Sequence, residues 1–209
     1  TVRSRLQEWS ALSGRDGCLT ATFDAELFGH WWFEGPRFIE AALRALHADP
    51  TVRVQTPSER LSSHPPDKVA WLPEGSWGEG GDHRVWLNDQ TRWTWEAQLR
   101  AEDRFMGLQW QVREGRSTRR AAAVLEEAAR ELLLLQASDW QFVIHSGGAV
   151  DYGYRRFAVH LDHFDALCGI VDDLLNGQRG LTDVQKSVRM HATHTDDCFT
   201  DVDLSVWGG

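Results

Sequence analysis

The sequence lacks long apolar stretches. Among its 209 residues, no apolar run approaches the roughly 20 residues that a helix needs to span a bilayer. Residues 1–14 also lack the apolar segment of a secretory signal. The sequence therefore predicts a protein that has no membrane partner, and we expect a cytoplasmic location.

Basic side chains are outnumbered. Lys and Arg total 22 against 31 Asp and Glu, which gives a formal net charge of -9. Binding to a phosphate backbone needs clustered Lys and Arg, so this balance argues against a nucleic-acid partner.

Cysteine is also scarce. The three residues Cys18, Cys168 and Cys198 cannot all pair with one another, and their spacing matches no zinc pattern. We expect reduced thiols, which are typical of a cytosolic protein. No other pattern in the sequence indicates a cofactor, so we expect neither a metal nor a cofactor.

Tryptophan, in contrast, is abundant. The chain has 11, and ten of them lie between Trp9 and Trp140. An unusually aromatic core would explain this content. A sugar-binding cleft would explain it equally well, because indole faces stack on pyranose rings while polar groups fix the hydroxyls. Composition leaves both explanations open.

The periodicity of the sequence divides the chain into two parts. Residues 1–90 contain short β-branched segments that alternate with helical patterns, and the segments that predict strands are 18–24, 52–55 and 69–72. The helical patterns of this part are 36–48 and a helix start at 56–59. Residues 91–209 predict helices only, over 91–112, 118–137, 151–176 and 182–192.

The predicted fold class is therefore α/β plus all-α, with the change near residue 90. A parallel sheet of two or three strands cannot cover its own faces and edges. We expect these strands to belong to a larger sheet whose other strands lie upstream.

The first candidate site is a carboxylate cluster among aromatic residues. Asp24 lies where a predicted strand ends, and α/β proteins place their sites at such ends. Glu26, His30 and Trp31 follow within one short segment. A carboxylic acid held beside aromatic rings can act as the general acid in glycoside cleavage. The alternative is a carboxylate that caps the next helix beside an aromatic core.

Two further clusters contain tryptophan. Residues 73–90 have no periodicity and predict a glycine-rich loop that contains Trp77 and Trp86. These indoles could bind a ligand, or they could be buried and pin a surface loop. Asp139 and Trp140 lie between two predicted helices, where the alternative to binding is a helix cap with aromatic packing.

The sequence DAELFGHWWFEGP at 24–36 resembles glycoside hydrolase family 57, particularly its branching enzymes. The resemblance continues through GSWGEGGDHRVWLN at 75–88, TRWTWE at 91–96 and ELLLLQASDWQF at 131–142. It covers nearly the whole chain. It implies that residues 1–90 form the last part of a (β/α)7 barrel and that residues 91–209 form a helical C-terminal domain.

The resemblance also implies roles for individual residues. Asp24 matches the catalytic general acid/base, and Glu26 matches a neighbouring carboxylate. The remaining matches are substrate-binding positions: His30 and Trp31 in the aromatic wall, Trp77 and Trp86 in the glucan cleft, and Asp139 and Trp140 in a motif of the helical domain that faces the cleft.

The implied activity is α-glucan branching by retaining transglycosylation, which forms α-1,6 branches from α-1,4-glucan (amylose, glycogen or maltooligosaccharides) in glycogen-type polysaccharide synthesis. No Glu of this chain matches the nucleophile of the family. The resemblance therefore implies an upstream N-terminal half, in cis or as a separate chain. The alternatives are a family-57 α-amylase or 4-α-glucanotransferase, or an inactive glucan-binding subunit.

Overall fold

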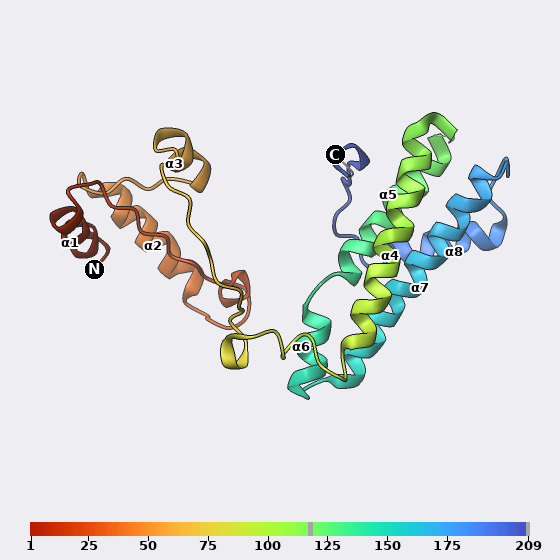
Figure 1. Ribbon diagram of the computed structural model, residues 1–209, viewed down its shortest axis with the longest axis horizontal. Helices are drawn as coiled ribbons and strands as arrows, with labels where there is room; N and C mark the ends of the chain where they lie inside the picture. The colour runs from red at the N-terminus through yellow and green to blue at the C-terminus, as the bar shows by residue number, and fades with distance from the viewer. Residues whose placement is uncertain (117–118, 208–209) are drawn as a thin grey trace. The chain divides into compact units, whose positions relative to one another are not determined.

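The computed structural model describes residues 1–116 and 119–207 (Figure 1). The chain divides into two compact units, Thr1–Leu72 and Pro73–Gly209. The glycine-rich loop 73–90 is thus grouped with the helices that follow it, whereas the predicted division lay after residue 90.

The first unit contains three α-helices and one short 3-10 helix, namely α1 (Val2–Ser13), η1 (Ala25–Phe28), α2 (Gly35–Ala48) and α3 (Pro57–Ser63). The helix predicted at 36–48 is confirmed. The helix start at 56–59 is confirmed as well: Thr56 Oγ1 accepts from the Glu59 backbone N–H at 3.2 Å, and Glu59 Oε2 accepts from the Thr56 N–H at 2.8 Å. Helix α1 was not predicted.

The three predicted strands are not formed in the part of the chain that the structure describes. The backbone at 18–24, 52–55 and 69–72 runs without regular secondary structure. A strand exists through the hydrogen bonds of its neighbours, and these segments find no neighbouring strand within the described residues. The all-α part of the predicted fold class is therefore confirmed, whereas the α/β part is not seen within the described residues, whose fold is helical.

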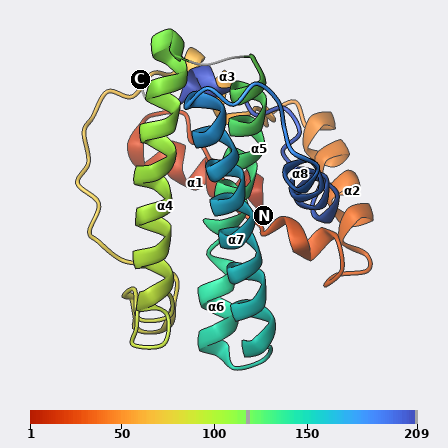
Figure 2. The same cartoon turned by 90° about the vertical axis from the view of Figure 1, so that its right-hand side faces the viewer.

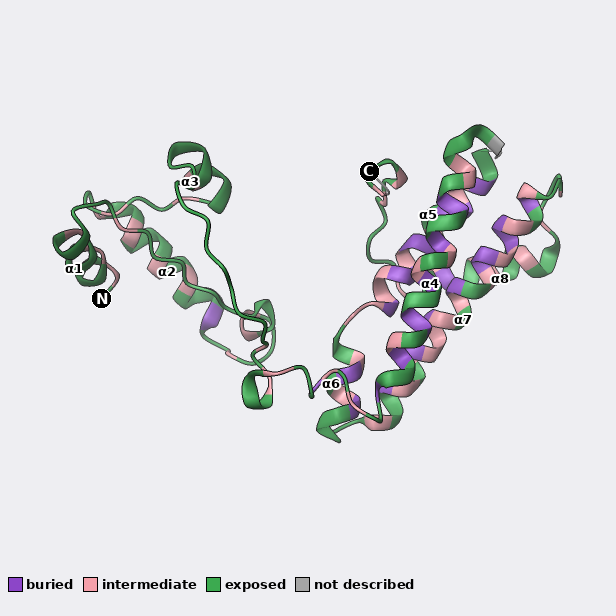
Figure 3. Cartoon of the chain, viewed as in Figure 1, coloured by how far each residue is buried: buried purple, intermediate pink, exposed green. Residues whose placement is uncertain are grey.

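The first unit has almost no interior of its own. Gly35 is its one buried residue, while Trp9, Phe33 and Trp71 are 57%, 91% and 84% exposed. Figure 3 shows the contrast with the second unit, where buried residues line the helices. A folded domain is stabilised mainly by burying apolar side chains. This unit leaves most of its apolar side chains in water, so it lacks a stabilising core of its own.

The second unit is a helical bundle. Its elements are η2 (Glu79–Gly81), α4 (Arg92–Gln111), the π-helical turn η3 (Val112–Arg116), α5 (Arg119–Leu135), α6 (Asp139–Ser146), α7 (Val150–Leu175), α8 (Asp183–Thr195) and η4 (Leu204–Val206). Helices α4, α5 and α7 run side by side (Figure 2). The four helices predicted from residue 91 onward are confirmed, except that residue 118, the predicted start of the second, lies outside the described residues. Helix α6 was not predicted.

The bundle has a well-packed apolar core. Phe105 of α4, Leu125 and Leu132 of α5, and Phe157 and Phe164 of α7 are at most 1% exposed. The apolar stripe of each helix therefore meets the others along the bundle axis. Ala97 and Ala101 of α4 belong to this core, and Trp140 of α6 packs against it. Both helices contact the glycine-rich loop 73–90.

Candidate functional site

Asp24 lies on an extended backbone immediately before η1. Its φ and ψ angles are -65° and 131°, and its carbonyl oxygen accepts from the Leu27 N–H at 3.1 Å. The side chain makes no capping hydrogen bond to η1 and is exposed. The alternative of a capping carboxylate therefore does not describe Asp24, and its carboxyl group remains available to a ligand.

The other predicted residues of this segment lie close to Asp24 along the chain. Glu26 is exposed in the first turn of η1, and its carbonyl oxygen accepts from the His30 N–H at 3.1 Å. The rings of His30 and Trp31 are 5.5 Å apart, and Trp31 is 69% exposed. Segment 24–31 thus presents two carboxylates and two aromatic rings to solvent.

Packing of the next residue fixes this segment. The Trp32 ring lies 4.9 Å from Phe38 and 6.1 Å from Phe28. Gly35 permits this arrangement, because an added Cβ would lie 3.0 Å from a Phe28 ring carbon and 3.1 Å from a Trp32 ring carbon. Trp32 therefore packs against η1 and α2 while its neighbour Trp31 points outward.

The tryptophan loop, residues 73–91, is closed by its own hydrogen bonds. The Ser76 N–H donates to the Gly81 carbonyl at 2.9 Å, and the Gly81 N–H donates to the Gly78 carbonyl at 2.9 Å. Gly80 and Gly81 have φ angles of 73° and 72°, which glycine adopts without strain. At Gly78 an added Cβ would lie 2.8 Å from a Trp86 ring carbon, so the backbone must pass closely over this indole.

An aromatic cluster of Trp77, Trp86 and Phe142 lies on this loop and on α6. The Trp77 ring is 5.0 Å from Trp86, with an interplanar angle of 79°, and 5.6 Å from Phe142. The Trp86 carbonyl oxygen accepts from Trp95 Nε1 at 2.8 Å, which anchors the loop to α4. Trp77 is nevertheless 78% exposed. The alternative interpretation, in which two buried indoles hold the loop in place, therefore does not describe either indole fully. It fits Trp77 least.

Polar side chains of the loop are paired with one another. Asp82 accepts from Arg84 Nε at 2.9 Å, and this pairing lowers the pKa of the Asp82 carboxyl to about 2. His83 Nε2 lies 3.0 Å from Glu74 Oε1. Both Asp82 oxygens accept from Arg84, whereas the contact with His83 uses only Oε1 of the exposed Glu74.

The third predicted pair divides between two environments. Asp139 is exposed in the first turn of α6. Trp140 turns inward: its Nε1 donates to the Leu134 carbonyl at 2.8 Å, and its ring stacks on His160 at 5.8 Å. The Arg156 guanidinium lies 5.6 Å from the centre of the Trp140 ring. Trp140 therefore takes part in aromatic packing, as the alternative to ligand binding proposed for this pair, while Asp139 faces solvent.

Sequence analysis included Phe142 in the segment 131–142 but assigned it no role, and it did not single out His145. Both lie on the exposed face of α6, and His145 Nδ1 lies 3.3 Å from Asn88 Nδ2 of the tryptophan loop. The sequence signal was the spacing: Asp139, Phe142 and His145 follow one another at intervals of three residues. Residues three apart are neighbours on one helix face. It was missed because α6 itself was not predicted.

Two properties of the described residues bear on other site types. Within 1–116 and 119–207, no group of three or more His, Cys, Asp or Glu side chains is arranged to hold a metal ion. In the same ranges, no helix combines the length and apolarity needed to cross a membrane.

The likeness to solved structures extends over both units. A branching enzyme of glycoside hydrolase family 57 type from Pyrococcus horikoshii matches 98% of this chain at 34% identity, with a TM-score of 0.75. The α-amylase AmyC from Thermotoga maritima matches 97% of the chain at 25% identity, with a TM-score of 0.64. The chain covers 37% and 36% of these proteins, respectively.

Sequence comparison gives the same relatives. A 1,4-alpha-glucan branching enzyme of Thermococcus kodakarensis is 43% identical over 169 residues, which cover 79% of this chain and 24% of that enzyme. The matched part of the chain thus spans 24% to 34% of the length of these curated relatives. The sequence profile described as "1,4-alpha-glucan branching enzyme, C-terminal" matches residues 98–207, just over half of the chain. The chain therefore belongs to the family of 1,4-alpha-glucan branching enzyme C-terminal domains, within glycoside hydrolase family 57.

Proposed function

We propose that this chain is the C-terminal part of a 1,4-α-glucan branching enzyme. The observation that supports this most directly is the exposed indole of Trp77, held beside Trp86 in a chain that belongs to the branching-enzyme family. An indole face open to solvent is suited to stacking on a glucose ring. The substrate would be an α-1,4-glucan such as amylose, glycogen or a maltooligosaccharide.

The proposal assigns the first unit to the last part of a (β/α)7 barrel. Its exposed apolar side chains, such as Trp9 and Trp71, are suited to packing against strands and helices supplied from upstream. The partial coverage of the relatives agrees with an upstream half that lies in cis or on a separate chain. We call this chain together with that half the assembled enzyme. The three free cysteines favour a cytoplasmic location.

In the proposed reaction, Asp24 protonates the glycosidic oxygen of the leaving glucan. A glutamate of the upstream half attacks the anomeric carbon, and a covalent glycosyl-enzyme forms. Asp24 then removes the proton from a sugar 6-hydroxyl as that oxygen attacks the anomeric carbon and releases the glutamate. The product is an α-1,6 branch. Such a retaining mechanism needs its two carboxyl groups roughly 5–5.5 Å apart.

The remaining predicted residues would bind the glucan. Glu26 and His30 would hold hydroxyl groups near the reacting bond, and Trp31 would form the aromatic wall beside it. Trp77 and Trp86 would line the cleft and limit the entry of water, which would otherwise give hydrolysis. Asp139 would accept from sugar hydroxyls at the edge of the helical domain. Trp140 would act indirectly, because its ring is enclosed by His160 and Arg156.

The test is a branching assay of the assembled enzyme on amylose, followed by debranching and counting of the released chains. New α-1,6 linkages that disappear in Asp24→Asn support the proposal. Retained turnover in Asp24→Asn would remove this residue from the mechanism. Asp16→Asn, which alters an exposed carboxylate of the same unit, should leave the activity unchanged and serves as the control.

A second candidate is hydrolysis of α-glucan, which is favoured by the likeness to the α-amylase AmyC. It shares Asp24 and the retaining chemistry but uses water as the acceptor. The same assay separates the two candidates, because hydrolysis yields new reducing ends without new branch points.

A further inference from the structure

One face of α6 meets the tryptophan loop. Asp139, Phe142 and His145 follow one another at intervals of three residues, and all three are exposed. Residues at this spacing lie on the same side of a helix. The intervening Gln141 points inward and donates to Thr94 Oγ1 at 3.0 Å, which fixes the rotation of α6 in the bundle.

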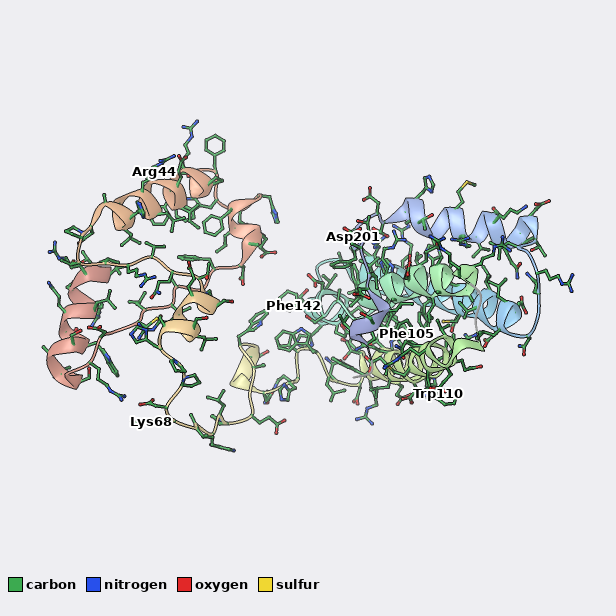
Figure 4. The ribbon with its side chains drawn as sticks, turned by 90° about the horizontal axis from the view of Figure 1, so that it is seen from above. Arg44, Lys68, Phe105, Trp110, Phe142 and Asp201 are labelled. Carbon is green, nitrogen blue, oxygen red and sulfur yellow. The ribbon has the colours of Figure 1, made fainter. Side chains whose placement is uncertain are left out.

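Two of these three residues contact the loop. The Phe142 ring lies 5.6 Å from Trp77 and 6.4 Å from Trp86, with interplanar angles of 45° and 34°. His145 Nδ1 lies 3.3 Å from Asn88 Nδ2. Figure 4 shows Phe142 apart from the densely packed side chains around Phe105. Phe142 therefore serves the surface of the unit rather than its core.

Trp77 needs support that its own segment does not provide. It is 78% exposed, so most of the ring area is in water. Trp86 meets it at an interplanar angle of 79° and does not lie flat against it. Phe142 adds a second contact from a rigid helix. A ring that is already held in place loses less conformational freedom when a ligand stacks on it, and this favours binding.

We propose that Phe142 is a positioning residue for glucan binding, which holds the Trp77 indole in the orientation that receives a glucose ring. Helix α6 thereby couples the helical bundle to the affinity for substrate. This inference rests on the proposed function, because it assumes that Trp77 contacts the glucan. Phe142 acts through Trp77 and takes no part in bond breaking.

The test uses the assembled enzyme with Phe142→Ala, Trp77→Ala and the double variant. Kd for maltoheptaose is measured by calorimetry, and KM and kcat are measured on amylose. Phe142→Ala should raise Kd and KM about 3- to 10-fold, the amount expected for loss of an aromatic pair, with little change in kcat. Phe142→Tyr, which keeps the ring, should restore both values.

The double variant separates positioning from general damage to the fold. If Phe142 acts through Trp77, adding Phe142→Ala to Trp77→Ala should raise Kd less than about twofold further. Met190→Ala is the matched control, because Met190 is an apolar side chain on α8 that is 60% exposed. It should change neither Kd nor KM in either background.

The inference is overturned if Phe142→Ala leaves Kd and KM within about twofold of the unchanged enzyme, or if its effect adds in full to that of Trp77→Ala. Its failure is distinct from failure of the proposed function. An enzyme that binds maltoheptaose but forms no branches would refute branching alone. The Kd values of the variants would still test the positioning role of Phe142. An enzyme that neither binds nor branches would refute both.

Discussion

Glu131 Oε2 and His160 Nδ1 lie 2.8 Å apart inside the helical bundle, and their side chains are 2% and 0% exposed. His160 Nε2 lies 3.0 Å from Arg156 Nη2, which also donates to Asp196 at 2.9 Å. A guanidinium can only donate, so Nε2 accepts and Nδ1 donates to Glu131. This chain of hydrogen bonds joins α5, α7 and the segment after α8, directly beneath the Trp140 ring.

Glu131→Ala should destabilise the bundle by about 3–5 kcal/mol. The substitution leaves the buried His160 Nδ1–H without an acceptor and opens a cavity between α5 and α7. Urea denaturation, together with hydrogen exchange of α5 and α7, would measure the loss. Glu126→Ala on the exposed face of the same helix is the control and should change stability by less than about 0.5 kcal/mol. Equal losses in the two variants would contradict the assigned role of the pair.

Arg189→Ala should loosen α8 from α5. Arg189 Nε donates to Glu127 Oε2 at 2.7 Å and Nη2 donates to Oε1, so the half-buried pair is bidentate. We expect a loss of roughly 1–2 kcal/mol, reduced from that of a fully buried pair by partial exposure. Arg189→Lys should not restore it, because an ammonium cannot form the two parallel bonds. Hydrogen exchange of α8 would report the loss.

The control for this experiment lies on the same helix. Lys186 and Asp183 form an ion pair at 2.9 Å, with side chains 62% and 98% exposed. Pairs of this kind contribute little to stability, so Lys186→Ala should leave the exchange of α8 almost unchanged. A large effect of Lys186→Ala would mean that the overall charge of α8 keeps this helix in place. The ion pair of Arg189 with Glu127 would then not be the main cause.

The ion pair of Asp82 and Arg84 should keep the tryptophan loop ordered over a wide pH range. The hydrogen bonds that Asp82 accepts from Arg84 lower its pKa from 3.8 to about 2. Its contribution is therefore present above about pH 4 and is lost as the pH falls towards 2. Tryptophan fluorescence of the unchanged protein should stay constant from pH 7 to 4. The variant Asp82→Asn, which cannot form the ion pair, should already show faster hydrogen exchange in 73–91 at pH 7. Unchanged exchange would mean that the glycine turn alone orders the loop.

The helices of the bundle could be predicted because their apolar stripes are periodic and the bundle buries them within the same chain. Helix α7 shows this, since Phe157, Phe164 and Val171 recur at intervals of seven residues and are all buried. Helix α6 was missed because it has only eight residues, and its inward and outward positions alternate too briefly to form a recognisable stripe.

The strands could not be judged in the same way. Segment 18–24 has the residue types of a buried strand, but a strand depends on hydrogen bonds from neighbouring strands, and residues 1–116 and 119–207 supply none. For the site, residue types identified candidate ligand-binding side chains. They did not predict which of these side chains contact one another. Sequence analysis placed Trp77 and Trp86 on one loop but did not predict their ring contact, and the contact of Trp77 with Phe142 depends on α6, 65 positions further along the chain.

Cys168 should resist thiol reagents as long as the bundle is folded. It is fully buried in α7, and desolvation raises the pKa of its thiol from 9.0 to about 12. The thiolate is the reactive species, so reaction should require opening of the bundle. Cys198 is exposed and should react at once at pH 8. Counting labelled cysteines by mass spectrometry, with and without urea, would measure the difference.

The same shift gives a sign for alkaline stability. The unfolded chain releases the Cys168 proton near pH 9, while the folded chain keeps it to about pH 12, so stability is fully present below pH 9 and falls as the pH rises through this window. Cys168→Ala should lower stability at pH 7 through the cavity that it creates, and should also flatten the decline above pH 9. An equally steep decline in Cys168→Ala would assign the alkaline transition to another group.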